Sequence, residues 1–239
     1  MEWKIERELY EEWYSNEHLI EQLNDPFVEY IDQQGDHQLL DIGCAQSEFV
    51  LKYLSIGAQV TAIDEDPLQA GALRRRVNKL GDGAEDRCTI QCGHFPTVRP
   101  QSRSFDLCVL SNVLHFQHQN DQLETLRVIR HHLVDDALLH VRVHSSKHYG
   151  GLPKDDLRFK QFFSPEDLEK VVVEAGFDVV VVQEEPEPRT AFQTAFITEW
   201  ITRVHRARRA AEHELYGRIA EYLAEGPLVA TWGVFRVRQ

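Results

Sequence analysis

Short apolar runs alternate with amphipathic stretches along most of the 239-residue chain. Short runs of apolar and β-branched residues predict strands at 38–42, 59–63, 88–92, 105–110 and 137–143. Between them, apolar residues recur at spacings of three and four and predict helices over 47–57, 66–81 and 120–133. This alternation predicts an α/β fold, a parallel sheet with helices on both faces.

The two ends of the chain add further elements to this core. Residues 1–34 have an amphipathic helical pattern that Asp25-Pro26 restarts, and 191–224 form a second long helical pattern. Ser164-Pro165 opens a helix that ends near Gly176, and strands follow at 177–182 and 228–237. We therefore expect a single domain over 1–239, divided into an N-terminal helical lid (1–35), a core (36–185), a helical insertion (186–226) and a last strand (227–239).

The first two predicted strands each end at an aspartate. Asp41 is followed by Gly43 and a short polar loop, and Val60-Thr61-Ala62-Ile63 ends in Asp64. Glycine permits a sharp turn and a close approach of a ligand, and N–H groups at the start of the next helix favour a polar or anionic group. A carboxylate at the end of the second strand can accept hydrogen bonds from ribose hydroxyls. The two features together predict a nucleotide-type cofactor site.

Charge and composition exclude several classes of function. The formal net charge of −13 disfavours general nucleic-acid binding through phosphate contacts. No apolar run is long enough to span a membrane, and the polar N-terminus does not resemble a signal peptide, so we expect a cytoplasmic protein with no membrane partner.

His115 and His118 have no obvious carboxylate or cysteine partner, so no metal site is expected. The cysteines fit no zinc motif and are expected to be reduced core thiols: Cys44, Cys88, Cys92 and Cys108.

Four segments carry a family resemblance. They are the loop 41–47, Asp64 after its strand, Gly93-His94-Phe95-Pro96 with the strand segment 104–115, and 163–168 with 174–177. Together they resemble the class I S-adenosylmethionine-dependent methyltransferases, over about 36–183 and the last strand. The resemblance implies a Rossmann-like sheet of seven strands in the order 3-2-1-4-5-7-6, with the last strand antiparallel. It also implies S-adenosylmethionine as the cofactor.

The resemblance assigns cofactor-binding roles to particular residues. Asp41 and the backbone of Gly43, Cys44 and Ala45 would hold the methionine part. The remaining assignments concern the ribose (Asp64 and Glu65), the adenine (His94 and Phe95), the end of the fourth strand (Ser111 and Asn112) and an aromatic lid (Tyr14, with Tyr10 and Trp13).

Three positions depart from the family pattern. Ala45 and Ser47 stand where close relatives usually carry glycine, and His94 stands where an acid is usual. A positive φ at Ala45 would cost about 1 kcal/mol or more, whereas Ser47 can cap the following helix. These departures keep open a second interpretation, a catalytically idle binding or scaffold protein on the same fold.

Two histidines are candidate catalytic groups. His115 and His144 follow the fourth and fifth strands, at the edge where ligands bind in open α/β sheets. A histidine there can accept a proton from the acceptor, although methyl transfer to a good nucleophile needs little acid–base help.

The class of molecule that would accept the methyl group is limited mainly by motifs that the sequence lacks. The segment Leu110-Ser111-Asn112-Val113 is not the Asn/Asp-Pro-Pro-aromatic segment typical of enzymes that methylate exocyclic base nitrogens, and no Pro-Cys pair exists. We therefore expect methylation of an oxygen, nitrogen or carbon atom of a small molecule, with 189–224 covering the acceptor pocket or forming a homodimer contact. An RNA or protein methyltransferase is the alternative, although the arginine cluster in 203–209 is more typical of a solvated helix face. A nicotinamide-dependent dehydrogenase shares the first two motifs but would need a companion catalytic signature that the chain lacks.

Overall fold

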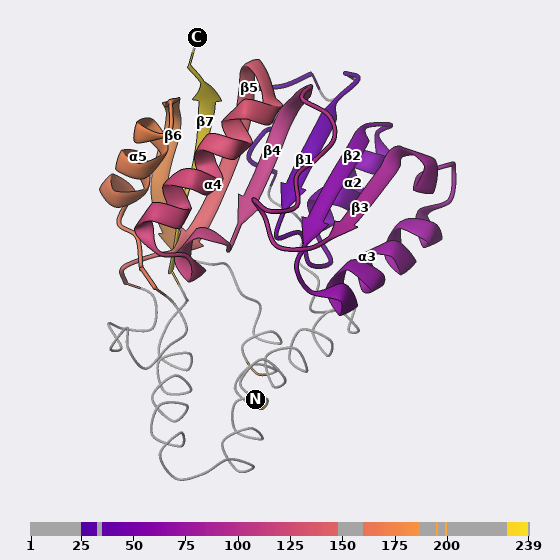
Figure 1. Cartoon of the computed structure of the whole chain (residues 1–239), viewed down its shortest axis with the longest axis horizontal. Helices are drawn as coiled ribbons and strands as arrows, with labels where there is room; N and C mark the ends of the chain where they lie inside the picture. Colours follow the sequence, from indigo (N-terminus) through magenta and orange to yellow (C-terminus); the bar gives the residue numbers. More distant parts are fainter. Residues whose placement is uncertain are drawn as a thin grey trace.

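A single seven-stranded sheet organises the protein (Figure 1). The computed structural model describes residues 25–32, 35–147, 160–186 and 229–238, with Ala195 and Glu199. The strands are β1 (Gln38–Ile42), β2 (Gln59–Asp64), β3 (Cys88–Cys92), β4 (Phe105–Ser111), β5 (Leu133–His144), β6 (Phe177–Pro186) and β7 (Val229–Val237). Their order is β3-β2-β1-β4-β5-β7-β6. The pairs within β1–β5 are parallel, whereas β7 is antiparallel to both β5 and β6. The predicted fold and strand order are confirmed.

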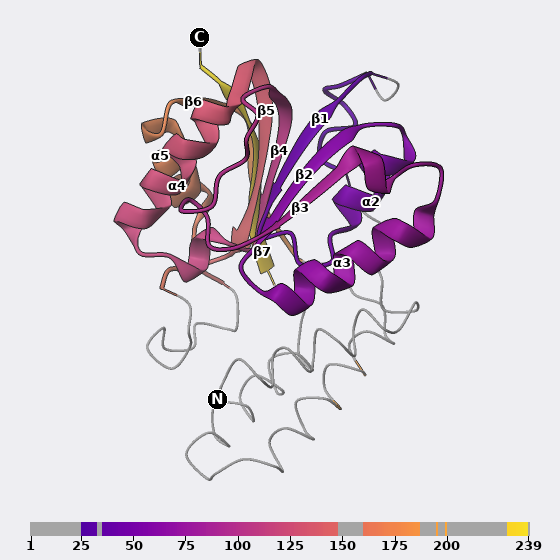
Figure 2. The same ribbon diagram turned by 45° about the vertical axis from the view of Figure 1, so that its right-hand side comes forward.

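Helices cover both faces of this sheet (Figure 2). Helices α2 (Glu48–Ser55) and α3 (Pro67–Leu80) pack on one face, with Val50, Tyr53, Leu54, Leu73 and Val77 in one core cluster. Helices α4 (Gln119–His132) and α5 (Pro165–Glu174) pack on the other, and short 3-10 turns lie at Glu85–Arg87 (η1) and Leu114–Phe116 (η2). Alternate residues of the central strands belong to the two hydrophobic clusters, one on each face of the sheet. The sheet is therefore buried on both sides, as expected for parallel strands.

Side-chain caps fix where the helices begin. Ser47 accepts the N–H of Val50, and Asp66 accepts that of Leu68 with proline at the next position. Ser164 forms a reciprocal capping box with Asp167. Each of these starts agrees with the sequence prediction.

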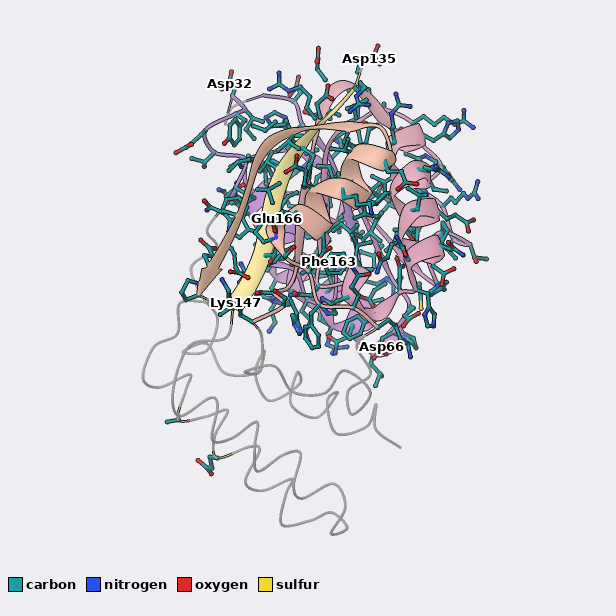
Figure 3. All side chains as sticks on the ribbon, turned by 90° about the vertical axis from the view of Figure 1, so that its left-hand side faces the viewer. Asp32, Asp66, Asp135, Lys147, Phe163 and Glu166 are labelled. Carbon is teal, nitrogen blue, oxygen red and sulfur yellow. The ribbon has the colours of Figure 1, made fainter. Side chains whose placement is uncertain are left out.

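The carboxyl ends of the parallel strands meet at one edge of the sheet. Figure 3 shows Asp66, which follows β2, and Lys147, which follows β5, at one end of the molecule, with Asp32 and Asp135 at the other. The pairing of Pro186 with Val229 brings the end of β6 and the start of β7 to this same carboxyl edge. The connection over 187–228 therefore leaves and re-enters the sheet there.

The segment before β1 differs from the predicted helix. Residues 26–30 form turns, and the Asp25 carboxylate accepts hydrogen bonds from the Phe27 N–H (2.9 Å), Lys52 Nζ (2.5 Å) and the Tyr53 hydroxyl (3.1 Å). Phe27 is fully buried, so the segment is held by contacts with α2 rather than by helical hydrogen bonds. In the described part of the chain, no helix is both long and apolar enough to cross a membrane.

Candidate functional site

The loop between β1 and α2 uses its N–H groups within the protein. The N–H groups of Gly43 and Cys44 donate to the Ile63 carbonyl (2.8 and 3.2 Å), and that of Ala45 donates to Asp64 Oδ2 (2.7 Å). These three N–H groups are therefore already hydrogen-bonded within the protein.

Two residues of this loop have left-handed backbone conformations. Gly43 has φ of 69°, and a Cβ built there would lie 2.3 Å from Val113 Cγ2, so the turn needs glycine for the protein's own packing. Ala45 has φ of 43° although it carries a side chain. This conformation costs an alanine roughly 1 kcal/mol, so surrounding contacts must hold it.

Asp41 and Asp64 form a buried acidic pair at the ends of β1 and β2. Asp41 is 2% exposed, and Ser47 Oγ donates to its Oδ2 at 2.5 Å. Burial raises the pKa of Asp41 to about 7, the Ser47 hydrogen bond opposes this rise, and the charge of Asp64 adds to it. Burial also raises the pKa of Asp64, against the hydrogen bonds it accepts from the N–H groups of Asp66 and Ala45. A cation beside this pair would relieve both effects.

The predicted adenine side holds an exposed pair and a buried ring. His94 Nδ1 lies 2.8 Å from Glu65 Oε2, and both side chains are more than half exposed. Phe95, in contrast, is 6% exposed and packs in the cluster beneath α4 and α5. The structure thus places Glu65 and His94 together beside Asp64, at the ends of β2 and β3.

Ser111 and Asn112 lie at the carboxyl end of β4, as predicted. Ser111 is half-buried and pairs in register with Arg142 of β5. Asn112 is exposed, has φ of 59° and donates its N–H to the Arg142 carbonyl (2.8 Å). The β4–β5 junction therefore continues the edge that begins at Asp41 and Asp64.

His115 and His144 are brought into contact at this edge. Their ring centroids lie 4.0 Å apart with the rings 27° from parallel, and His144 also stacks on Phe162. The backbone N–H of His144 donates to His115 Nδ1 (3.3 Å), which places the proton of a neutral His115 on Nε2. His115 is fully buried, whereas His144 is half-buried.

Some predicted residues fall elsewhere. Tyr14, with the rest of 1–24, and nearly all of the segment 187–228 lie outside the described residues. Cys44 and Cys108 are buried, but Cys92 is exposed rather than a core thiol, because β3 is an edge strand.

Sequence reasoning missed two residues of α3. The side chains of Gln69 and Arg76 reach the loop between β1 and α2. Their spacing of seven residues places them on one helix face, but no sequence pattern indicates that this face meets the loop.

Comparison with known proteins agrees with this geometry. Residues 40–139 match a protein family described as a methyltransferase domain, a span that begins in β1 and ends in β5. Over these residues the chain is similar to a methyltransferase domain. The domain includes every described position that the resemblance assigns to the cofactor.

Solved structures with this fold include enzymes of several activities. A protein of Galdieria sulphuraria described as a candidate sarcosine dimethylglycine methyltransferase has a TM-score of 0.65 at 16% identity, covering 86% of this chain and 80% of its own. The 4+2 cyclase SpnF has a TM-score of 0.64 at 17% identity, covering 85% of this chain and 75% of its own. Phosphoethanolamine N-methyltransferase 2 of Haemonchus contortus, solved with S-adenosylmethionine, has a TM-score of 0.59 at 17% identity, covering 85% of this chain and 49% of its own.

These low identities establish the class I methyltransferase fold and not the reaction. A sequence search among curated proteins finds no match.

Proposed function

We propose that this protein is an S-adenosylmethionine-dependent methyltransferase that acts on a small molecule. The observation that carries the proposal is the pair Asp41 and Asp64, buried beside the loop 43–47 within the residues that are similar to a methyltransferase domain. No nucleic-acid or membrane partner is part of this proposal.

The chemistry of these groups suits the proposed cofactor. S-adenosylmethionine carries an ammonium group and a sulfonium, and positive charge beside Asp41 would favour its ionised form. Asp64 already accepts two N–H groups, but a carboxylate has about four lone-pair sites and can still accept ribose hydroxyls. Glu65, beside it, would take part at the ribose, and the Glu65–His94 pair would border the adenine.

When bound, the cofactor supplies an electrophilic methyl group on sulfur. The chain's own task is to align an acceptor atom in line with the methyl–sulfur bond, so that the new bond forms as that bond breaks and S-adenosylhomocysteine leaves. We assign the proton released by an oxygen or nitrogen acceptor to His144, whose ring is half-buried. His115 is fully buried and stacks on His144, so we assign it to positioning.

The names of similar structures support a small acceptor. Sarcosine, dimethylglycine and phosphoethanolamine, in the names of two of them, are small molecules that contain an amine nitrogen. The edge beside β4 and β5 is where an acceptor would reach His144, close to the ends of the connection over 187–228.

One observation favours a second candidate, a non-catalytic binding protein. The Ser47 hydroxyl and three loop N–H groups are all engaged within the protein, which is also what a loop relieved of cofactor binding would show. Loss of cofactor binding would favour this candidate.

Calorimetric titration separates the two candidates. We expect micromolar binding of S-adenosylmethionine and S-adenosylhomocysteine by wild type, no binding of NAD, and much weaker binding by Asp64→Ala. If the folded wild-type protein binds neither compound, the methyltransferase proposal is refuted and the non-catalytic binding protein is favoured. Cofactor binding would be followed by a screen of small amines and hydroxy compounds for methyl transfer.

A further inference from the structure

Helix α3 holds the loop between β1 and α2 through two side chains, which we call the α3 clamp (Gln69 and Arg76). The Arg76 guanidinium donates from Nη1 to the Gln46 carbonyl and from Nη2 to Glu48 Oε1. Gln46 Nε2 donates to Gln69 Oε1 at 3.1 Å. One face of α3 therefore holds both the backbone and the side chain of Gln46 in the loop, and also Glu48, the first residue of α2.

The clamp is well shielded from solvent. Gln46 and Gln69 are each 7% exposed, and the Arg76 side chain is 19% exposed. A guanidinium has a rigid planar fork of donors, so a single arginine can hold a carbonyl and a carboxylate in fixed relation. Buried, low-exposure contacts of this kind order a loop more firmly than exposed ion pairs do.

The loop needs such restraint because its sequence lacks two of the usual glycines. Ala45 occupies a left-handed conformation that alanine disfavours, and Ser47 is committed to Asp41. A strained conformation persists only where its surroundings over-determine it. The clamp acts on Gln46, directly between these two residues.

We propose that Arg76 is a positioning residue for the cofactor loop, setting through Gln46 and Glu48 the geometry in which the loop binds S-adenosylmethionine. The inference rests on the proposed function, because it concerns affinity for that cofactor. Arg76 acts through the loop and needs no contact with the cofactor itself.

The test compares Arg76→Ala with Arg75→Ala in the full chain. Arg75 is an exposed arginine one position away on the same helix, so the control removes the same charge. We expect the dissociation constant for S-adenosylhomocysteine to rise about tenfold in Arg76→Ala, by analogy with metal sites, where loss of an outer-shell partner lowers affinity by about 10- to 100-fold. It should change less than twofold in Arg75→Ala, while thermal melting temperatures of the two variants stay close.

Arg76→Lys separates charge from geometry. Lysine keeps the charge but loses the fork, so we expect its affinity to lie between those of wild type and Arg76→Ala. This variant also decides the question if Arg76→Ala does not fold, since a wild-type dissociation constant in Arg76→Lys would then refute the inference.

The outcomes distinguish the two proposals. Absence of S-adenosylhomocysteine binding by wild type overturns both the proposed function and this inference. Tight binding by wild type that is unchanged in Arg76→Ala, or equally weakened in Arg75→Ala, overturns the positioning role alone.

Discussion

Replacing Asp41 by asparagine should make folding less sensitive to pH. Burial and the charge of Asp64 raise the pKa of this carboxyl from 3.8 to about 7, against the hydrogen bond from Ser47. Because the folded protein holds the proton more tightly than the unfolded chain, the stability that the protonated Asp41 contributes is fully present below pH 3.8 and is lost as the pH rises to about 7. Asparagine has nearly the same shape, can accept the Ser47 hydroxyl and does not ionise.

The magnitude follows from the size of the pKa shift. At about 1.4 kcal/mol per pKa unit, the cost of ionising Asp41 grows by about 2 to 3 kcal/mol between pH 5 and pH 8. We therefore expect the free energy of unfolding of Asp41→Asn, minus that of wild type, to increase by this amount over the same range. A fixed offset from altered hydrogen bonding would not affect the slope.

Urea unfolding of both proteins at several pH values between 5 and 8 measures this difference. Ser47→Ala is a useful companion, because loss of its hydrogen bond should raise the pKa of Asp41 further and extend the loss of stability to higher pH. Loss of the helix cap should add a pH-independent destabilisation of about 1 kcal/mol. A difference between Asp41→Asn and wild type that stays constant with pH would show that burial does not perturb this carboxyl as the geometry indicates.

Three further predictions concern packing and exposure. Gly43→Ala should destabilise the protein by about 2 kcal/mol or more, since its φ is 69° and its Cβ would meet Val113, and Val113→Ala should restore part of the loss in urea unfolding. Asp25→Asn should cost about 2 kcal/mol by the same measurement, because the buried carboxylate loses its charge-assisted hydrogen bond with the Lys52 ammonium, and an unchanged midpoint would contradict this. Cys92, the exposed cysteine, should react at once with a thiol reagent in the native protein, while the buried Cys44 and Cys108 react only as it unfolds, and Cys92→Ser should remove the fast reaction.

The sequence predicted the sheet well because buried strands leave a strong apolar pattern. β1, β2 and β4 begin and end within one residue of the predicted limits, and the family resemblance supplied their order. The apolar pattern did not predict the ends of strands that are extended by pairing with a neighbouring strand rather than by burial. β5 begins at Leu133 rather than 137, and β6 continues to Pro186 because β7 pairs with it along its whole length.

The candidate site was only partly predictable. The placement of Asp41 and Asp64 at the ends of their strands follows from their spacing in the sequence. The left-handed conformation at Ala45 fits a position where close relatives usually carry glycine. The engagement of the loop N–H groups and the reach of Arg76 depend on tertiary contacts between residues about twenty to thirty positions apart, which no local pattern encodes. The stacking of His115 on His144 likewise required the register of β4 and β5.

The antiparallel placement of β7 has a consequence for how this protein can change. Pro186 and Val229 are paired neighbours, so the two ends of the connection over 187–228 lie next to each other at the sheet edge. The entropy of closing such a loop grows only with the logarithm of its length, so doubling it costs roughly 0.6 kcal/mol. Residues can therefore be added, deleted or exchanged in this connection while the strand order and the Asp41–Asp64 pair remain intact. Under the proposed function, exchange of this one segment is therefore where a change of acceptor preference would be sought, with the part of the sheet that carries Asp41 and Asp64 left unaltered.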